Sequence, residues 1–104
     1  MTSGELARSF LVECYWPGVS EEALVAAARR TCSEASALRH GGCDVAFLGS
    51  ILVPADETVF SLFRGCEADV RAASTRAGLP FERILGSLHV DGLEIGRAGG
   101  GDRT

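Results

Sequence analysis

Side chains of the types that bind transition metals recur at the boundaries between the predicted helices and strands. The chain has two histidines and four cysteines, and imidazole, thiolate and carboxylate groups are the usual ligands of nickel and zinc. The candidate metal ligands are His40, Cys43, Cys66 and His89, with the neighbouring carboxylates Asp44, Glu67 and Asp91. Because the sequence contains no C-x-x-C or H-E-x-x-H spacing, this set depends on the fold to bring its members together.

Each of these residues also has an ordinary structural explanation. His40 would favour the C-terminus of a helix, and Cys43 and Cys66 would be small, partly buried residues at strand ends. His89 would lie on an open face of a sheet. Cys66 has a further interpretation, because it precedes a predicted helix whose free amide groups would favour a reactive thiolate. The remaining two cysteines are expected to be inert free thiols, one in the core and one in mid-helix: Cys14 and Cys32.

A second candidate site is a small pocket lined by Glu13, Tyr15 and Trp16. Glu13 is a carboxylate within an apolar strand, and such a group in a partly closed cleft can act as a base or as a ligand. It could also pair with an arginine of a second copy of the chain. Phe81 would join Tyr15 and Trp16 at this pocket, although ordinary core and interface packing is the simpler explanation for the aromatic residues.

A hairpin at the centre of the chain determines the order of the elements. Apolar runs at residues 45–53 and 58–63 flank the polar turn 54–57, as in two antiparallel strands. Helical patterns lie on both sides of this hairpin, one capped by Ser20 and running to about residue 39, the other spanning 67–77. The other predicted elements are a strand at 9–15, a short helical turn at 81–84, a strand at 85–90 and some further strand to residue 95.

The resulting β-α-β-β-α-β order is the ferredoxin-like pattern. It predicts an α+β two-layer sandwich, with a four-stranded antiparallel sheet in the order 4-1-3-2 and both helices on one face. We expect a polar lead at residues 1–8, the domain at 9–95 and a disordered Gly-rich tail at 96–104. In this topology the candidate metal ligands share one end of the sheet.

The strands carry apolar side chains on both faces, so alternation alone leaves the open face undecided. That face would carry either the following residues or part of the alternating set: Leu11, Glu13, Tyr15, Phe60 and Leu62. An apolar sheet face is rarely left to water. We therefore predict that the open face packs against a second copy of the chain, as a homodimer.

Composition limits the classes of function. The 104 residues suit one domain, and a net charge of −4 without a basic run argues against nucleic-acid and anionic-membrane partners. Neither a signal peptide nor an apolar run long enough to span a membrane is present in the sequence, so the expected location is the cytoplasm. The chain also lacks a phosphate-binding Gly loop and a nucleophile elbow, so no residue is assigned as catalytic.

Three segments resemble one bacterial family of small ferredoxin-like proteins, long labelled as of unknown function, that includes a nickel-binding protein. They are YWPGVSEEAL at 15–24, LGSILVPADETVFSLF at 48–63 and AGLPFERI at 77–84, and the resemblance covers about residues 10–90. It implies a dimeric α+β sandwich or barrel and makes metal binding a hypothesis to test. The family's nickel ligands are not transferred to residues of this chain.

Two functions of different class follow from these observations. The first is a small cytoplasmic, non-enzymatic homodimer that binds nickel or another divalent transition metal. The second is a dimeric α+β barrel, similar to small monooxygenases or ligand-binding proteins, with its pocket on the open sheet face. The place where polar donors converge, at the end of the sheet or inside that face, would distinguish the two. A third possibility is an accessory dimer without small-molecule chemistry.

Overall fold

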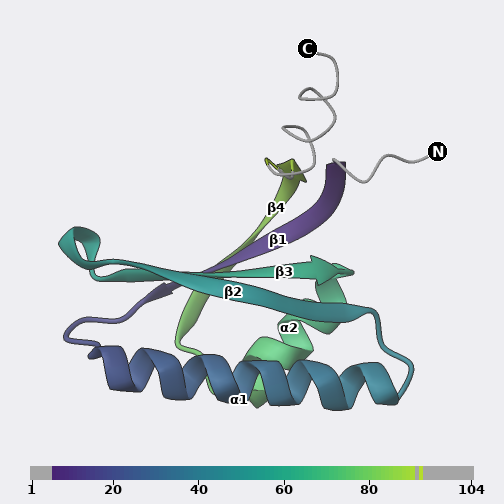
Figure 1. Ribbon diagram of the computed structural model, residues 1–104, viewed down its shortest axis with the longest axis horizontal. Helices are drawn as coiled ribbons and strands as arrows, with labels where there is room; N and C mark the ends of the chain where they lie inside the picture. Colours follow the sequence, from purple (N-terminus) through teal and green to yellow (C-terminus); the bar gives the residue numbers. More distant parts are fainter. Residues whose placement is uncertain (1–5, 91, 93–104) are drawn as a thin grey trace, which may run out of the picture.

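The chain folds as a two-layer α+β sandwich in a computed structural model that describes residues 6–90 and 92 (Figure 1). The elements are β1 (Leu6–Tyr15), α1 (Glu21–His40), β2 (Val45–Val53), the 3₁₀ turn η1 (Pro54–Asp56), β3 (Thr58–Gly65), α2 (Glu67–Arg76) and β4 (Phe81–Val90). The strands form one antiparallel sheet in the order β2-β3-β1-β4. This is the predicted order seen from the other edge, so the ferredoxin-like fold is confirmed. No helix of the described part is long and apolar enough to cross a membrane.

Local sequence explains where the long helix α1 begins and ends. The Ser20 side chain accepts a hydrogen bond from the Ala23 amide (3.0 Å), and two glutamates occupy the first turn, where the helix dipole favours acids. The helix stops at the Gly41-Gly42 pair, whose amides donate to carbonyls of the last turn. Gly42 has a positive φ of 98°, a conformation that glycine adopts at little cost.

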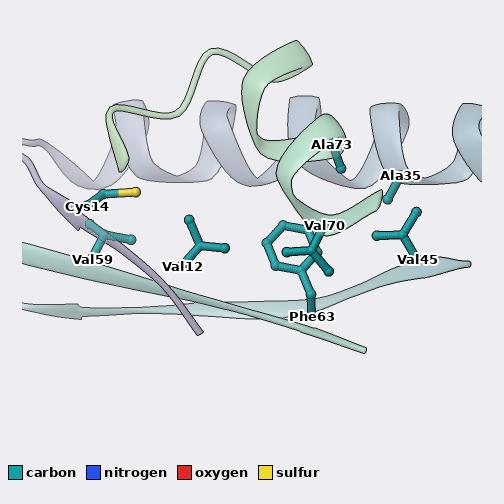
Figure 2. Packing of buried hydrophobic residues seen from close by; sticks show 8 residues of the cluster. All are labelled: Val12, Cys14, Ala35, Val45, Val59, Phe63, Val70 and Ala73. Atoms are coloured by element: carbon teal, nitrogen blue, oxygen red, sulfur yellow. The ribbon is translucent and has the colours of Figure 1, made fainter. Parts of the chain in front are cut away.

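The core lies between the sheet and the two helices, which cover the same face of the sheet (Figures 1 and 2). Small residues of the helices, among them Ala35 and Ala73, are fully buried there, which lets α1 and α2 sit close to the strands. The buried cluster contains Val12, Cys14, Ala35, Val45, Val59, Phe63, Val70 and Ala73. Phe63 is its largest member, and its ring lies 5.4 Å from that of Phe47, centroid to centroid.

Two element boundaries differ from the sequence prediction. The segment 81–84, predicted as a helical turn, is the beginning of β4, because Phe81 pairs with Cys14 and Arg83 with Glu13 across β1. Pairing with a central strand outweighs the weak local preference for helix. Strand β1 begins at Leu6, three residues earlier than predicted. The predicted tail 96–104, most of the lead 1–8 and most of the predicted strand from 91 to 95 lie outside the described residues.

The structure also resolves which face of the sheet is open. Phe10, Val12 and Cys14 of β1 point to the helices, so the alternating residues of that strand point away from them. We call the uncovered side the open face. By strand alternation and register it carries Leu11, Glu13, Tyr15, Ile51, Val53, Phe60, Leu62, Arg83 and Leu85. Neither helix lies on this side of the sheet (Figure 1).

Candidate metal site at the end of the sheet

The end of the sheet where β2 begins and β3 stops is held together by a glycine. Gly65 has a φ of 137°, and a Cβ atom at this position would lie 2.2 Å from the Asp44 carbonyl oxygen. A larger residue would push the strands apart. With glycine in place, the Cys66 amide donates to that same carbonyl over 3.1 Å. Gly65 therefore brings the connection before β2 against the start of α2.

Asp69 organises the side chains at this end. Its Oδ2 atom accepts a hydrogen bond from the Asp44 amide over 2.8 Å. This backbone hydrogen bond holds the pKa of Asp69 below its usual range, and hydrogen bonds from the thiols of Cys66 and Cys43 lower it further. Two cysteines that are far apart in sequence thus share one carboxylate, and we call Cys43, Cys66 and Asp69 the thiol cluster.

The two thiols of the cluster are in different surroundings. Cys66 is exposed at the N-cap of α2, whereas Cys43 is half-buried in the connection before β2. Loss of hydration raises the pKa of Cys43, and the charge and hydrogen bond of Asp69 raise it further. Cys43 is therefore held in its neutral thiol form at neutral pH.

His40 lies beside this cluster, in the last turn of α1. It is exposed, and with Arg39 and Cys43 it lines a shallow depression in the surface. Its Nδ1 atom is 2.8 Å from the Ser36 carbonyl oxygen. If Nδ1 donates this hydrogen bond, the Nε2 lone pair is left for a metal ion, the arrangement common among metal-binding histidines.

His89 is not brought to the thiol cluster within one chain. It lies in β4, where its backbone pairs with Ala7, and β4 and β2 are the opposite edges of the sheet. Three strand spacings of about 4.8 Å place the two edges roughly 14 Å apart. His40, Cys43 and Cys66 lie at the predicted end of the sheet, but the width of the sheet separates His89 from them.

The carboxylates expected beside these ligands behave differently from one another. Asp44 contributes its backbone to the cluster, as described above, and Glu67 forms an exposed ion pair with Arg71 at 3.5 Å. Asp91 lies outside the described residues. Asp69 was missed by the sequence analysis, although a cysteine at the N-cap with an acid three residues later has the spacing of a capping box.

As folded, residues 6–90 contain no group of three or more His, Cys, Asp or Glu side chains arranged to hold a metal ion. A metal ion would have to displace the thiol protons that now bind Asp69. The sequence-predicted set therefore fits a metal only in part: His40, Cys43 and Cys66 lie at one end of the sheet, whereas His89 lies on the opposite edge strand.

The predicted pocket of Glu13, Tyr15 and Trp16 is divided between the two faces of the sheet. Glu13 and Tyr15 lie on the open face, where Glu13 Oε1 accepts a hydrogen bond from Nε of Arg83 and forms an ion pair with it. Trp16 packs against the core and, with Val19, lines a separate cleft of about 140 Å³. The arginine partner that a second copy could have supplied is thus provided within the chain.

The fold is similar to that of a solved structure. The solved structure of SCO4226 from Streptomyces coelicolor A3(2) superposes with a TM-score of 0.58 at 23% sequence identity, covering 73% of this chain and 90% of that one. No protein-family profile and no curated protein matches the chain. At this level of identity the similarity supports the fold.

Proposed function

We propose that this chain is a homodimer that binds a soft divalent metal ion, such as nickel, and carries out no catalysis of its own. The observation that supports this proposal is the convergence of the Cys43 and Cys66 thiols on the Asp69 carboxylate. Thiolates select softer transition metals over magnesium or calcium. His40 is the nearest imidazole, and its Nε2 atom would add a nitrogen ligand to the two sulfur ligands.

The proton balance of this site determines how binding depends on pH. A metal ion takes thiolates, so binding must release the thiol protons. Because Asp69 raises the pKa of Cys43, metal binding competes with the proton more effectively as the pH rises. We expect affinity to increase with pH across the neutral range, and to do so less in an Asp69→Asn variant, where the thiol is easier to deprotonate.

The direct test is a calorimetric titration of the reduced, metal-stripped chain with Ni²⁺ and then with Zn²⁺. We expect saturable binding at a fixed metal-to-chain ratio and a thiolate-to-nickel charge-transfer band. Cys43→Ser and Cys66→Ser should abolish the band, and His40→Ala should weaken binding. Cys32→Ser is the matched control, because Cys32 is an exposed thiol of α1 outside the cluster. Weak binding without a fixed ratio would reject the metal function.

Self-association is supported by the open face. Its residues Leu11, Phe60 and Leu62 are only half-buried, and Ile51 is 64% exposed. Contiguous apolar surface of this kind marks contact sites with other chains. The Glu13–Arg83 pair supplies both signs of charge on the same face, so a two-fold related copy can meet it with complementary charges.

Sedimentation over a range of concentrations tests the dimer. Leu62→Lys places a charge in the middle of the open face and should give a folded monomer. Leu88→Lys is the control, because Leu88 is 68% exposed and its strand position points to the opposite side of the sheet. A monomeric wild-type chain, or equal effects of the two variants, would contradict an interface on the open face.

The open face also favours a second candidate function, the binding of a small organic ligand. The observation is the Glu13–Arg83 pair, a polar feature surrounded by apolar side chains such as Leu11 and Leu85. Such surroundings suit an apolar molecule with one polar group. A thermal-shift screen of the wild-type chain would identify ligands that stabilise it. The same ligands should not stabilise the Leu62→Lys and Glu13→Gln variants if they bind to the open face.

A further inference from the structure

Cys43 and Cys66 lie on neighbouring segments of the chain at the end of the sheet where β2 begins and β3 ends. The Cys66 amide bonds to the Asp44 carbonyl, one step beyond the last ladder pair, Val45 with Gly65. Opposed residues of an antiparallel ladder have Cα atoms about 4.5–5.5 Å apart, within the range of about 4.4–6.8 Å found in disulfides. Cys43 directly precedes Asp44, the residue that stands opposite Cys66.

The local structure allows the remaining movement. Cys43 lies in the connection between α1 and β2, outside both elements, so its side chain can shift without breaking the sheet. Cys66 is the N-cap of α2, and its side chain makes no capping hydrogen bond that a new covalent bond would disrupt. Both thiols also lie close enough to the Asp69 carboxylate to lower its pKa.

We propose that Cys43 and Cys66 form a reversible intramolecular disulfide when the chain meets a hydroperoxide, with Cys66 as the sulfur that reacts first. The Cys66 thiolate attacks one peroxide oxygen, which yields a sulfenic acid and releases water from hydrogen peroxide. The Cys43 thiol then attacks the sulfenic sulfur, the S–S bond forms, and the hydroxyl leaves with a proton as a second water. The two thiols lose two electrons and two protons, and the peroxide accepts both.

The order of reaction follows from the surroundings of each thiol. Cys66 is exposed at the N-cap of α2, so a peroxide can reach its sulfur atom. Cys43 is half-buried and therefore less accessible to the oxidant, so we assign it the resolving role. Cys14 is fully buried and Cys32 stands alone on α1, so neither offers a competing partner within the chain.

This inference goes beyond the proposed metal binding and does not depend on it, because the disulfide would form in metal-free protein. If both hold, they exclude each other. Oxidation would remove both sulfur ligands at once, and a bound metal ion would protect both thiols. The disulfide assay below contains no metal, so its failure leaves the metal titration unaffected.

The test treats the reduced, metal-free full chain with hydrogen peroxide, blocks remaining thiols with iodoacetamide and measures intact mass and peptides. We expect two thiols to disappear together, a cross-linked peptide pair containing Cys43 and Cys66, and complete recovery with dithiothreitol.

Two variants make the result specific. Cys32→Ser should cross-link as the wild-type chain does. Cys43→Ser should give no internal cross-link, and Cys66 should proceed to the sulfinic acid, which dithiothreitol does not reverse. Sulfinic acid at Cys66 of the wild-type chain without a cross-link would overturn the proposal, as would a disulfide that joins two chains through Cys66.

Discussion

The two faces of the sheet carry similar side chains but have different surroundings. On the covered face, Val12, Val59 and Phe63 are at most 2% exposed beneath the helices. On the open face, Leu62 and Phe60 alternate with them along β3 and remain half-buried. The comparison shows that hydrophobicity alone does not assign a residue to the core of this chain. The helices decide it, because they cover one face of the sheet and leave the other uncovered (Figure 1).

The largest effect should come from adjacent residues of β3 on opposite faces. Phe63→Ala removes the largest fully buried side chain and should cost about 3–5 kcal/mol of unfolding free energy. Leu62→Ala removes a half-buried side chain and should cost less than about 1.5 kcal/mol at concentrations where the chain is monomeric. Urea unfolding of the two variants at low protein concentration measures both values.

The concentration dependence of the same experiment sharpens the comparison. If a second copy covers the open face, the cost of Leu62→Ala should grow with protein concentration, because the dimer binds only the folded state. The cost of Phe63→Ala should stay constant. Equal costs at low concentration would mean that the two faces are equally important for folding the single chain, contrary to the burial of their residues.

Much of the fold followed from the sequence because local patterns were strong. The hairpin around Pro54, the Ser20 cap and the Gly41-Gly42 stop each encode their structure within a few residues. The choice of open face could not be predicted, because both alternating sets of residues 10–15 in β1 are apolar apart from Glu13. It depends on which set meets the helices, a contact between elements far apart in the sequence.

The candidate site was predicted less completely, for a related reason. Sequence placed His40, Cys43 and Cys66 at one end of the sheet, which the topology bears out. The sequence alone did not indicate that the width of the sheet separates His89 from them. It also missed Asp69, whose role depends on accepting a hydrogen bond from the Asp44 amide of another element.

The second prediction contrasts the buried thiol Cys14 with the exposed thiols. Burial, aided by the charges of Glu13 and Glu82, raises the pKa of Cys14 to about 11 from the ordinary value of 9.0. At pH 8 we expect an alkylating reagent to modify Cys32 and Cys66 quickly and Cys14 only after unfolding. Mass spectrometry with and without urea checks this order.

The same shift in pKa gives a pH dependence of stability. The folded chain holds the Cys14 proton more tightly than the unfolded chain does. Its contribution to stability is therefore complete below about pH 9 and is lost as the pH rises through about 11. Cys14→Ala should flatten this part of the profile. A wild-type chain whose Cys14 is alkylated at pH 8 under native conditions would contradict the tight packing of the covered face.

The smallest expected effect concerns the ion pair between Glu13 and Arg83 on the open face. Both partners retain access to water in the single chain, with side chains 24% and 65% exposed, so Arg83→Ala should change unfolding free energy by less than about 1 kcal/mol. In a dimer that covers this face, the same change leaves the Glu13 charge buried without a partner, which costs several kcal/mol. Arg83→Ala should therefore weaken association far more than it weakens folding. Sedimentation of this variant measures its association, and urea unfolding measures its folding stability. Glu13→Gln/Arg83→Ala is the control, because it also removes the unpaired charge of Glu13. If the double variant associates no better than Arg83→Ala, the ion pair lies outside the dimer interface, which would then involve other residues of the open face.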